Sequence, residues 1–191
     1  PGLRALREGL FYFLRNLLNG ELGKSIVYRI DTLKLIFSRM EPTVWLIGGS
    51  VLLAILLTVP LAAIAARQQG RLADQVIRLL STAGLGFPAF WLGIMMILLF
   101  SITLGWFPVS GYGSDWLEQL HHMVLPCLTV ALALAAVLIR NLRTSLLMEM
   151  RSDYVTAARA RGQPIARIFW RHVMPNSLVP TINLLAVNIG W

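Results

Sequence analysis

Residues 44–66 read VWLIGGSVLLAILLTVPLAAIAA, and this stretch decides the fold class. It carries no charged residue over 23 positions and stops at Arg67. As an α-helix it would be roughly 34 Å long, at about 1.5 Å per residue, which is enough to cross a bilayer. The composition agrees, because 57% of the 191 residues are hydrophobic and only 14% are charged, too few for the surface of a soluble domain.

Three further apolar runs follow along the chain. Residues 87–106 are the densest part of a charge-free stretch, residues 123–139 form a shorter run, and residues 173–191 form a run diluted by asparagines. A spanning helix needs about 20 mostly apolar residues. We therefore predict an all-α membrane protein, a polytopic bundle of transmembrane helices. The chain opens with proline and its last run is still in progress at Trp191, so we expect a fragment.

The charges between the runs predict how the helices are oriented. Residues 67–78 carry three arginines and one aspartate, residues 107–122 carry two acids and no lysine or arginine, and residues 140–171 carry seven arginines against two acids. By the positive-inside rule, the first and third connections are cytoplasmic and the second lies outside. We therefore expect a cytoplasmic loop at 140–172 within a transmembrane domain of residues 44–191.

The same rule places residues 1–43 outside, although they carry seven basic residues against four acids, which is a mild conflict. Apolar side chains recur there at helical spacing, which predicts an amphipathic helix lying along the membrane surface. These side chains are Leu3, Leu6, Leu10, Phe13, Leu14 and Leu17. We expect residues 1–43 to form an extracytoplasmic amphipathic segment.

One short motif suggests a nucleotide site. Gly23-Lys24-Ser25 matches the end of a phosphate-binding loop, but that loop needs a glycine where Leu18 stands, and a strand before it. We therefore expect no nucleotide site and no cofactor on this chain, and any ATP chemistry would belong to another chain. The single cysteine, Cys127, lies inside an apolar run and is interpreted as a packing residue.

A polar cluster lies in the outer connection. Asp115, Glu118, His121 and His122 could aim carboxylate and imidazole ligands at one metal, because Glu118 precedes the histidines by three and four residues. We favour the alternative that they are interfacial residues flanking a helix start. The four apolar runs contain no ionisable residue, which argues against a membrane enzyme, so we expect no catalytic and no metal site.

The most informative connection is the basic one. Residues 153–180 read DYVTAARARGQPIARIFWRHVMPNSLVP. Ser152 or the following aspartate suits the N-cap of a helix through Arg161, Gly162 supplies its stop, and Pro164 opens another helical turn. We therefore predict two short helices joined at a glycine.

In the second of these helices, Ile165, Ile168 and Phe169 fall at i, i+3 and i+4. This is the anchor spacing of a helix laid into a groove of a partner. Arg167 and Arg171 flank the apolar stripe. The alternative is that the basic loop is only an orientation signal.

This loop resembles the EAA loop of ABC importer permeases, whose pattern is Glu-Ala-Ala, three residues, Gly, nine residues, Ile, one residue, Leu-Pro. Thr156 stands for Glu, His172 for Ile and Met174 for Leu. The matching positions are Ala157, Ala158, Gly162 and Pro175. The sequence YVTAARARG is similar to the subfamily that carries dipeptides, oligopeptides and nickel. So are FPAFWLG at 87–93, LGWFPVSG at 104–111 and LLNGELGKS at 17–25, so the resemblance covers nearly the whole chain.

The resemblance implies a type I permease in a prokaryotic inner membrane, forming the path of peptides or a related small solute. It implies a second permease subunit, identical or not, two ATPase subunits that each bind one EAA loop, and an extracytoplasmic substrate-binding protein. We expect no nucleic acid partner, because basic residues beside apolar spans report membrane orientation. The implied ATPase-coupling residues are Thr156, Ala157, Ala158, Gly162, Ile165, Ile168, Phe169 and Pro175. Alternatives are an exporter or channel on the same scaffold, or a membrane enzyme or scaffold protein with a basic loop.

Overall fold

The structure is a computed structural model that describes residues 10–11, 15 and 22–190. The amphipathic helix predicted between residues 3 and 17 therefore lies almost wholly outside the described residues. The chain divides into two compact units, residues 1–45 and 46–191.

In the first unit, Gly23-Lys24-Ser25 belongs to a tight turn. Lys24 pairs with Asp31 in an isolated antiparallel bridge, and Gly23 has a φ of 70°. The backbone N–H of Ser25 donates to the Ile30 carbonyl at 2.9 Å. The chain then enters helix α2 at Thr32.

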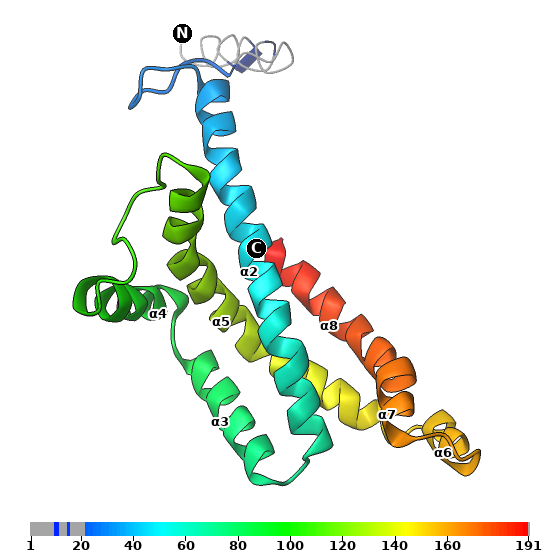
Figure 1. Ribbon diagram of the computed structural model, residues 1–191. Helices are drawn as coiled ribbons and strands as arrows, with labels where there is room; N and C mark the ends of the chain where they lie inside the picture. The colour runs from blue at the N-terminus through cyan, green and yellow to red at the C-terminus, as the bar shows by residue number, and fades with distance from the viewer. Residues whose placement is uncertain (1–9, 12–14, 16–21, 191) are drawn as a thin grey trace. The chain divides into compact units, whose positions relative to one another are not determined.

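The elements of the second unit are helical, which confirms the all-α prediction (Figure 1). They are α2 (Thr32–Arg67), which begins in the first unit, α3 (Leu72–Gly86), α4 (Ala89–Met96), the π-helix η1 (Ile97–Thr103), α5 (Trp116–Glu149), α6 (Asp153–Ala160), α7 (Ile165–Ile168), the π-helix η2 (Phe169–Val173) and α8 (Met174–Ile189). Helix α5 is the hub, because α3, α4 and α8 all pack against it.

Small residues bring these helices close together. A Cβ placed on Gly49 would lie 2.8 Å from the Cys127 sulfur, and one on Gly84 would lie 3.1 Å from the Ala136 methyl group. Ala131 is fully buried. Membrane helices associate through such contacts, since lipid removes the hydrophobic drive that acts in water. Cys127 is buried and free, in keeping with a packing residue.

The prolines act in two ways. Helices continue through Pro60, Pro126 and Pro180, as membrane helices can when neighbouring groups satisfy the freed carbonyls. Pro88 instead precedes the first residue of α4, and the pair formed by α3 and the α4–η1 helix is bent there by 104°. A residue before proline avoids the helical region, and Phe87 is accordingly extended, with φ −96° and ψ 126°.

Among the described residues, α2 and α5 are long and apolar enough to cross a membrane, and the bent pair of α3 with α4–η1 is a third candidate if it counts as one span. Helix α5 continues beyond the predicted span 123–139 as far as Glu149. The first ten residues of the predicted loop 140–172 therefore belong to the same rigid helix. The boundaries of the membrane itself stay a prediction.

Candidate coupling site

The basic loop folds as two short helices joined at a glycine, as predicted. After α6, the N–H of Gln163 donates to the Ala158 carbonyl at 3.2 Å and the N–H of Gly162 donates to the Arg159 carbonyl at 2.9 Å. This pair of bonds is a Schellman motif, and it needs a left-handed residue after the helix. Gly162 supplies it with a φ of 74°. Pro164 then precedes α7.

The predicted N-cap is correct in position but not in its hydrogen bond. Ser152 precedes α6 with extended backbone, φ −71° and ψ 155°. Its hydroxyl does not accept from the first turn of α6; it donates to the Glu149 carbonyl at 2.7 Å. Ser152 therefore secures the end of α5 and leaves the start of α6 without a side-chain cap.

One face of the loop is buried in the chain itself. Val155 and Ala158 of α6, with Ile168 and Phe169 after the glycine, are at most 3% exposed. They join one apolar cluster with side chains of α2 and α5, namely Ala62, Ala63, Ala65, Ala66, Leu142 and Leu146. The loop is thus anchored to the helices beside it.

This burial corrects the predicted anchor stripe. Ile165 is 64% exposed, whereas Ile168 is 2% and Phe169 is 3% exposed, so the three do not share an open face. Ile168 and Phe169 therefore pack inward and hold the loop in place.

The opposite face of the loop is open. Thr156, Ala157, Gly162, Ile165 and Pro175 are all exposed. Trp170, which the sequence reasoning passed over, joins them with 51% exposure, and its ring meets the Phe169 ring edge-on at 5.2 Å between centroids. Arg159, Arg161, Arg167 and Arg171 of the loop are exposed as well. Five of the eight predicted coupling residues thus lie open, while Ala158, Ile168 and Phe169 are buried.

An arginine and an aromatic ring attach the loop to α2. The Arg67 guanidinium lies 5.6 Å from the centre of the Phe169 ring, a cation–π arrangement. Arg67 also stands in the last turn of α2, where a positive charge favours the helix dipole. One side chain therefore ties the end of α2 to the loop.

A tyrosine bridges three elements beside the loop. The Tyr154 hydroxyl donates to the Glu149 carboxylate at 2.6 Å and accepts from the Asn176 side-chain amide at 3.4 Å. Partial burial raises the pKa of the Tyr154 phenol above its ordinary value of 10.0, and the hydrogen bond to Glu149 raises it further. Helix α8 is tied to α5 a second time, since the Thr181 hydroxyl donates to the Asn141 side-chain carbonyl at 3.0 Å.

An ion pair fastens α3 to α5. Nε and Nη2 of Arg143 donate to the two carboxylate oxygens of Asp74 at 2.6 and 2.8 Å, and the Gly70 N–H adds a third bond at 2.9 Å. The Asp74 side chain is only 2% exposed. In the sequence, Asp74 is the single acid among the arginines of residues 67–78, a signal that could have indicated a buried ion pair.

The outer cluster has structural partners. Glu118 accepts from the N–H and the hydroxyl of Ser114, both at 2.9 Å. His121 Nε2 lies 2.9 Å from the Trp106 carbonyl, and His122 Nδ1 lies 2.8 Å from the Glu118 carbonyl. In the part of the chain that the structure describes, no group of three or more His, Cys, Asp or Glu residues is placed to hold a metal.

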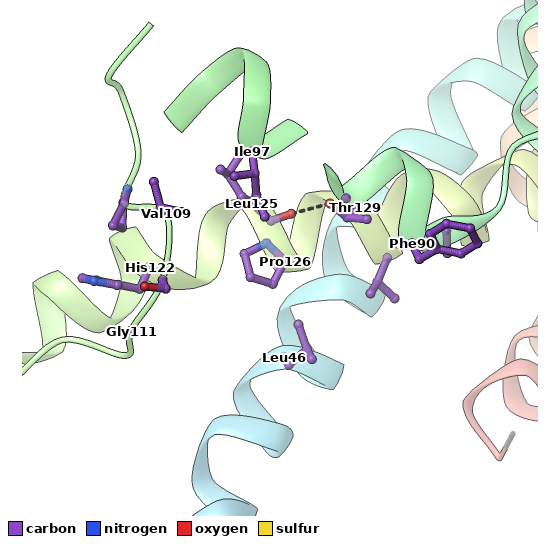
Figure 2. A pocket seen from close by; sticks show the side chains of 14 residues that line it. Leu46, Phe90, Ile97, Val109, Gly111, His122, Leu125, Pro126 and Thr129 are labelled. Atoms are coloured by element: carbon purple, nitrogen blue, oxygen red, sulfur yellow. Dashed lines mark hydrogen bonds between the residues drawn. The ribbon is translucent and has the colours of Figure 1, made fainter. Parts of the chain in front are cut away.

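A cavity of about 320 Å³ lies between α4, α5 and residues 108–111, with Leu46 of α2 at its wall (Figure 2). Its walls are mostly apolar. The His122 ring is engaged with the Glu118 carbonyl, and the Thr129 hydroxyl donates to the Leu125 carbonyl at 2.8 Å. Without convergent polar groups this cavity does not point to a particular solute.

Comparison with known proteins matches this architecture. Residues 58–191 match the family described as "Binding-protein-dependent transport system inner membrane component". The chain is 32% identical over 188 residues, 98% of its length, to the glutathione transport system permease protein GsiC of Pectobacterium atrosepticum. It is 33% identical over 186 residues, 97% of its length, to the protein of the same name from Escherichia coli K12.

The chain spans 60% of the length of the first relative and 59% of the second. Both relatives are named as permease proteins of a transport system, which confirms the resemblance to ABC importer permeases. The family match alone covers more than half of the chain. The chain therefore belongs to the binding-protein-dependent transport system inner membrane components and is an inner-membrane protein.

Proposed function

We propose that the chain belongs to the transmembrane permease subunit of an ATP-driven importer, which couples to a separate ATPase through α6, α7 and η2. The family and the two relatives support transport as the activity. Hydrolysis of ATP belongs to the partner, and this subunit catalyses no bond change. A peptide, glutathione or a related small solute is the substrate class, since the relatives are named for glutathione transport.

The observation that carries this proposal is the two-faced loop. Its inner face is buried against α2 and α5, and its outer face presents small side chains, Ile165 and Trp170 among four exposed arginines. A loop that served only as an orientation signal would need basic residues but not a buried face. A buried face makes the loop a fixed part of the helical body, and an open apolar face with a tryptophan suits a protein partner.

Motion at the ATPase would pass through this loop to the spans. Ala158, Ile168 and Phe169 act as positioning residues, because they hold the loop against α2 and α5. Thr156, Ala157, Gly162, Ile165, Trp170 and Pro175 form the contact face. Closure of two ATPase subunits on ATP would push each loop and tilt α2 and α5 together, alternating access to the substrate path.

The proposed assembly has a second permease subunit, two ATPase subunits and an extracytoplasmic binding protein that delivers substrate. In the membrane, residues 140–172 face the cytoplasm and residues 107–122 face outward, as the arginine distribution indicates. Residues 1–43 form the extracytoplasmic segment. Reporter fusions after Gly70 and Arg161 should read as cytoplasmic, and a fusion at Gly113 should read as external.

A pair of neighbouring substitutions tests the coupling face. Ala157→Glu places a charge on the exposed face, so the whole subunit should fold while copurification of the ATPase and substrate-stimulated ATP hydrolysis fall sharply. Ala158→Glu places the same charge in the buried cluster, where an unpaired charge costs several kcal/mol, so the folded subunit itself should be lost.

The matched control is Gln69→Glu, which adds the same charge on the exposed turn between α2 and α3. It should leave docking and stimulated hydrolysis near wild type. If Ala157→Glu binds and stimulates the ATPase as the control does, α6 does not contact the ATPase and the proposed coupling face is wrong.

A further inference from the structure

A second cavity lies between α3 and α5, next to the ion pair that joins them. Its volume is about 190 Å³, well above the ~10–15 Å³ that one water needs on the same measure. Its lining residues are Ile77, Arg78, Ser81, Thr82, Ile139, Arg140, Arg143 and Thr144. Three of these are arginines and three carry hydroxyl groups, a composition unlike that of the apolar cavity beside α4.

The charges around this cavity do not cancel. Asp74 is the carboxylate that pairs with Arg143, using two of the five donors of that guanidinium. Within residues 22–190, neither Arg78 nor Arg140 makes a hydrogen bond or a salt bridge to a carboxylate. Three guanidinium groups against one carboxylate leave an excess of two positive charges.

The hydroxyl groups add one donor. Ser81 and Thr144 donate to carbonyls of their own helices, at 2.7 and 2.9 Å. The Thr82 hydroxyl makes no hydrogen bond to any described residue, so its proton can point into the cavity. The walls therefore offer many donors and little negative charge, which selects for an anion with several oxygens.

The lining continues along α5 into apolar surface. An adjoining cavity of about 180 Å³ shares Arg143 and Thr144 and adds Leu147, Met148 and Arg151. Met148 is 70% exposed, and Leu79 and Leu80 of α3 are also exposed. Charged groups beside exposed apolar side chains match an amphiphile whose head is anionic.

We propose that the α3–α5 cavity binds a phosphate group, with Arg78, Arg140 and Arg143 as its ligands. Guanidinium forks bind phosphate oxygens in pairs, which a spherical halide cannot match. An anionic phospholipid headgroup is one source, because basic pockets between membrane helices hold such lipids on the cytoplasmic side. Free inorganic phosphate is the other source. The proposal is independent of ATPase docking.

The test uses the whole subunit in detergent and native mass spectrometry with added phosphatidylglycerol, phosphatidylcholine or inorganic phosphate. Phosphatidylglycerol should be retained in preference to phosphatidylcholine. Arg78→Gln with Arg140→Gln should weaken this retention about 30-fold, the effect expected when two basic residues lose their attraction for an anionic lipid. Retention of phosphatidylglycerol by Arg78→Lys with Arg140→Lys should fall between that of the wild type and that of the double glutamine variant. The charge remains in the lysine variant, but the forked geometry is lost.

The control is Arg159→Gln with Arg161→Gln, which removes the same charge from exposed positions of the loop. Lipid selectivity that survives millimolar phosphate supports a headgroup site. Binding of inorganic phosphate that the Arg78 and Arg140 substitutions abolish supports a site for the free anion. No selectivity and no phosphate binding in the wild type, or an equal loss in the control, would overturn the proposal, whatever happens to ATPase docking.

Discussion

The two ends of helix α5 use polar side chains in opposite ways. At the N-terminal end, Glu118 and His122 bond to groups four residues away in the chain, and His121 reaches fifteen residues back. At the C-terminal end, Arg143 reaches a partner 69 residues away and Asn141 one 40 residues away. The first end is satisfied locally, and the second is braced to other helices.

The difference indicates where rigidity is needed. The C-terminal end holds α3 through Asp74, α8 through Thr181, and α6 through Tyr154. Under the proposed coupling, a push on the loop would therefore move these helices together. At the N-terminal end, the bonds of Glu118, His121 and His122 shape the connection that leads into the helix. Substitutions at the two ends should differ accordingly.

The largest effect should come from breaking the ion pair at the braced end. Arg143→Leu leaves the Asp74 carboxylate buried without its partner, and removal of one member of a buried pair costs about 3–5 kcal/mol. The free energy of unfolding, measured with denaturant on the whole subunit in detergent, should fall by this amount.

The double variant Asp74→Leu with Arg143→Leu serves as the control, because it removes both charges. It should recover most of the lost stability, since apolar pairs of similar volume replace buried ion pairs well. If Arg143→Leu alone were as stable as wild type, the ion pair would not brace α3, and the contrast between the two ends would lose its strongest element.

The next largest effect is expected at Gly162, the glycine between α6 and α7. Gly162 has positive φ and nothing within 4 Å of an added Cβ, so a substitution there meets conformational strain and no steric clash. Gly162→Val should cost about 1–2 kcal/mol, and Gly162→Asn less, because asparagine tolerates the left-handed region. ATPase-stimulating activity should follow the order Gly, Asn, Val. Equal activity of the three would show that this turn does not set the docking geometry.

The two helices of this loop could be predicted from the sequence, but not which of their side chains point inward. The turn signals at Gly162 and Pro164 gave the break between the helices, because backbone conformation there depends on local residue type. Helical spacing also identified Ile168 and Phe169 as one apolar face. The same spacing serves a partner's groove and the chain's own core, so the pattern alone could not tell that these two side chains turn inward.

The contact between Asp74 and Arg143 could not be predicted from the sequence for a different reason. Asp74 and Arg143 are 69 residues apart, and only the packing of α3 on α5 brings them together. The positive-inside rule sums the charges of each connection, so it used both residues without indicating that they pair with each other. Trp170 was missed because it falls outside the i, i+3, i+4 spacing of Ile165, Ile168 and Phe169.

A smaller effect should come from the tyrosine brace. Tyr154→Phe removes one hydroxyl that bonds to both Glu149 and Asn176, at a cost of about 1 kcal/mol in the free energy of unfolding. Because the fold raises the pKa of this phenol, the folded state keeps the proton more tightly. Its contribution is present below pH 10.0 and is lost as the pH rises above that value.

Unfolding measured between neutral and strongly alkaline pH checks this assignment. The wild type should lose stability more steeply than Tyr154→Phe above pH 10.0, and the two curves should converge. Parallel curves throughout would mean that the Tyr154 proton does not hold α6 against α5.

The smallest effect should come from the locally bonded end of α5. His121→Ala with His122→Ala removes two ring contacts to the Trp106 and Glu118 carbonyls, and His121 is exposed. Exposed bonds of this kind are replaced by water, so the free energy of unfolding should change by about 0.5 kcal/mol or less. Transport of the reconstituted assembly should stay near wild type, with or without a chelator, because both rings contact backbone carbonyls. Loss of transport in a variant that still folds and assembles would give the histidines a functional ligand. The two ends of α5 would then differ in what they bind, and rigidity would no longer be the distinction between them.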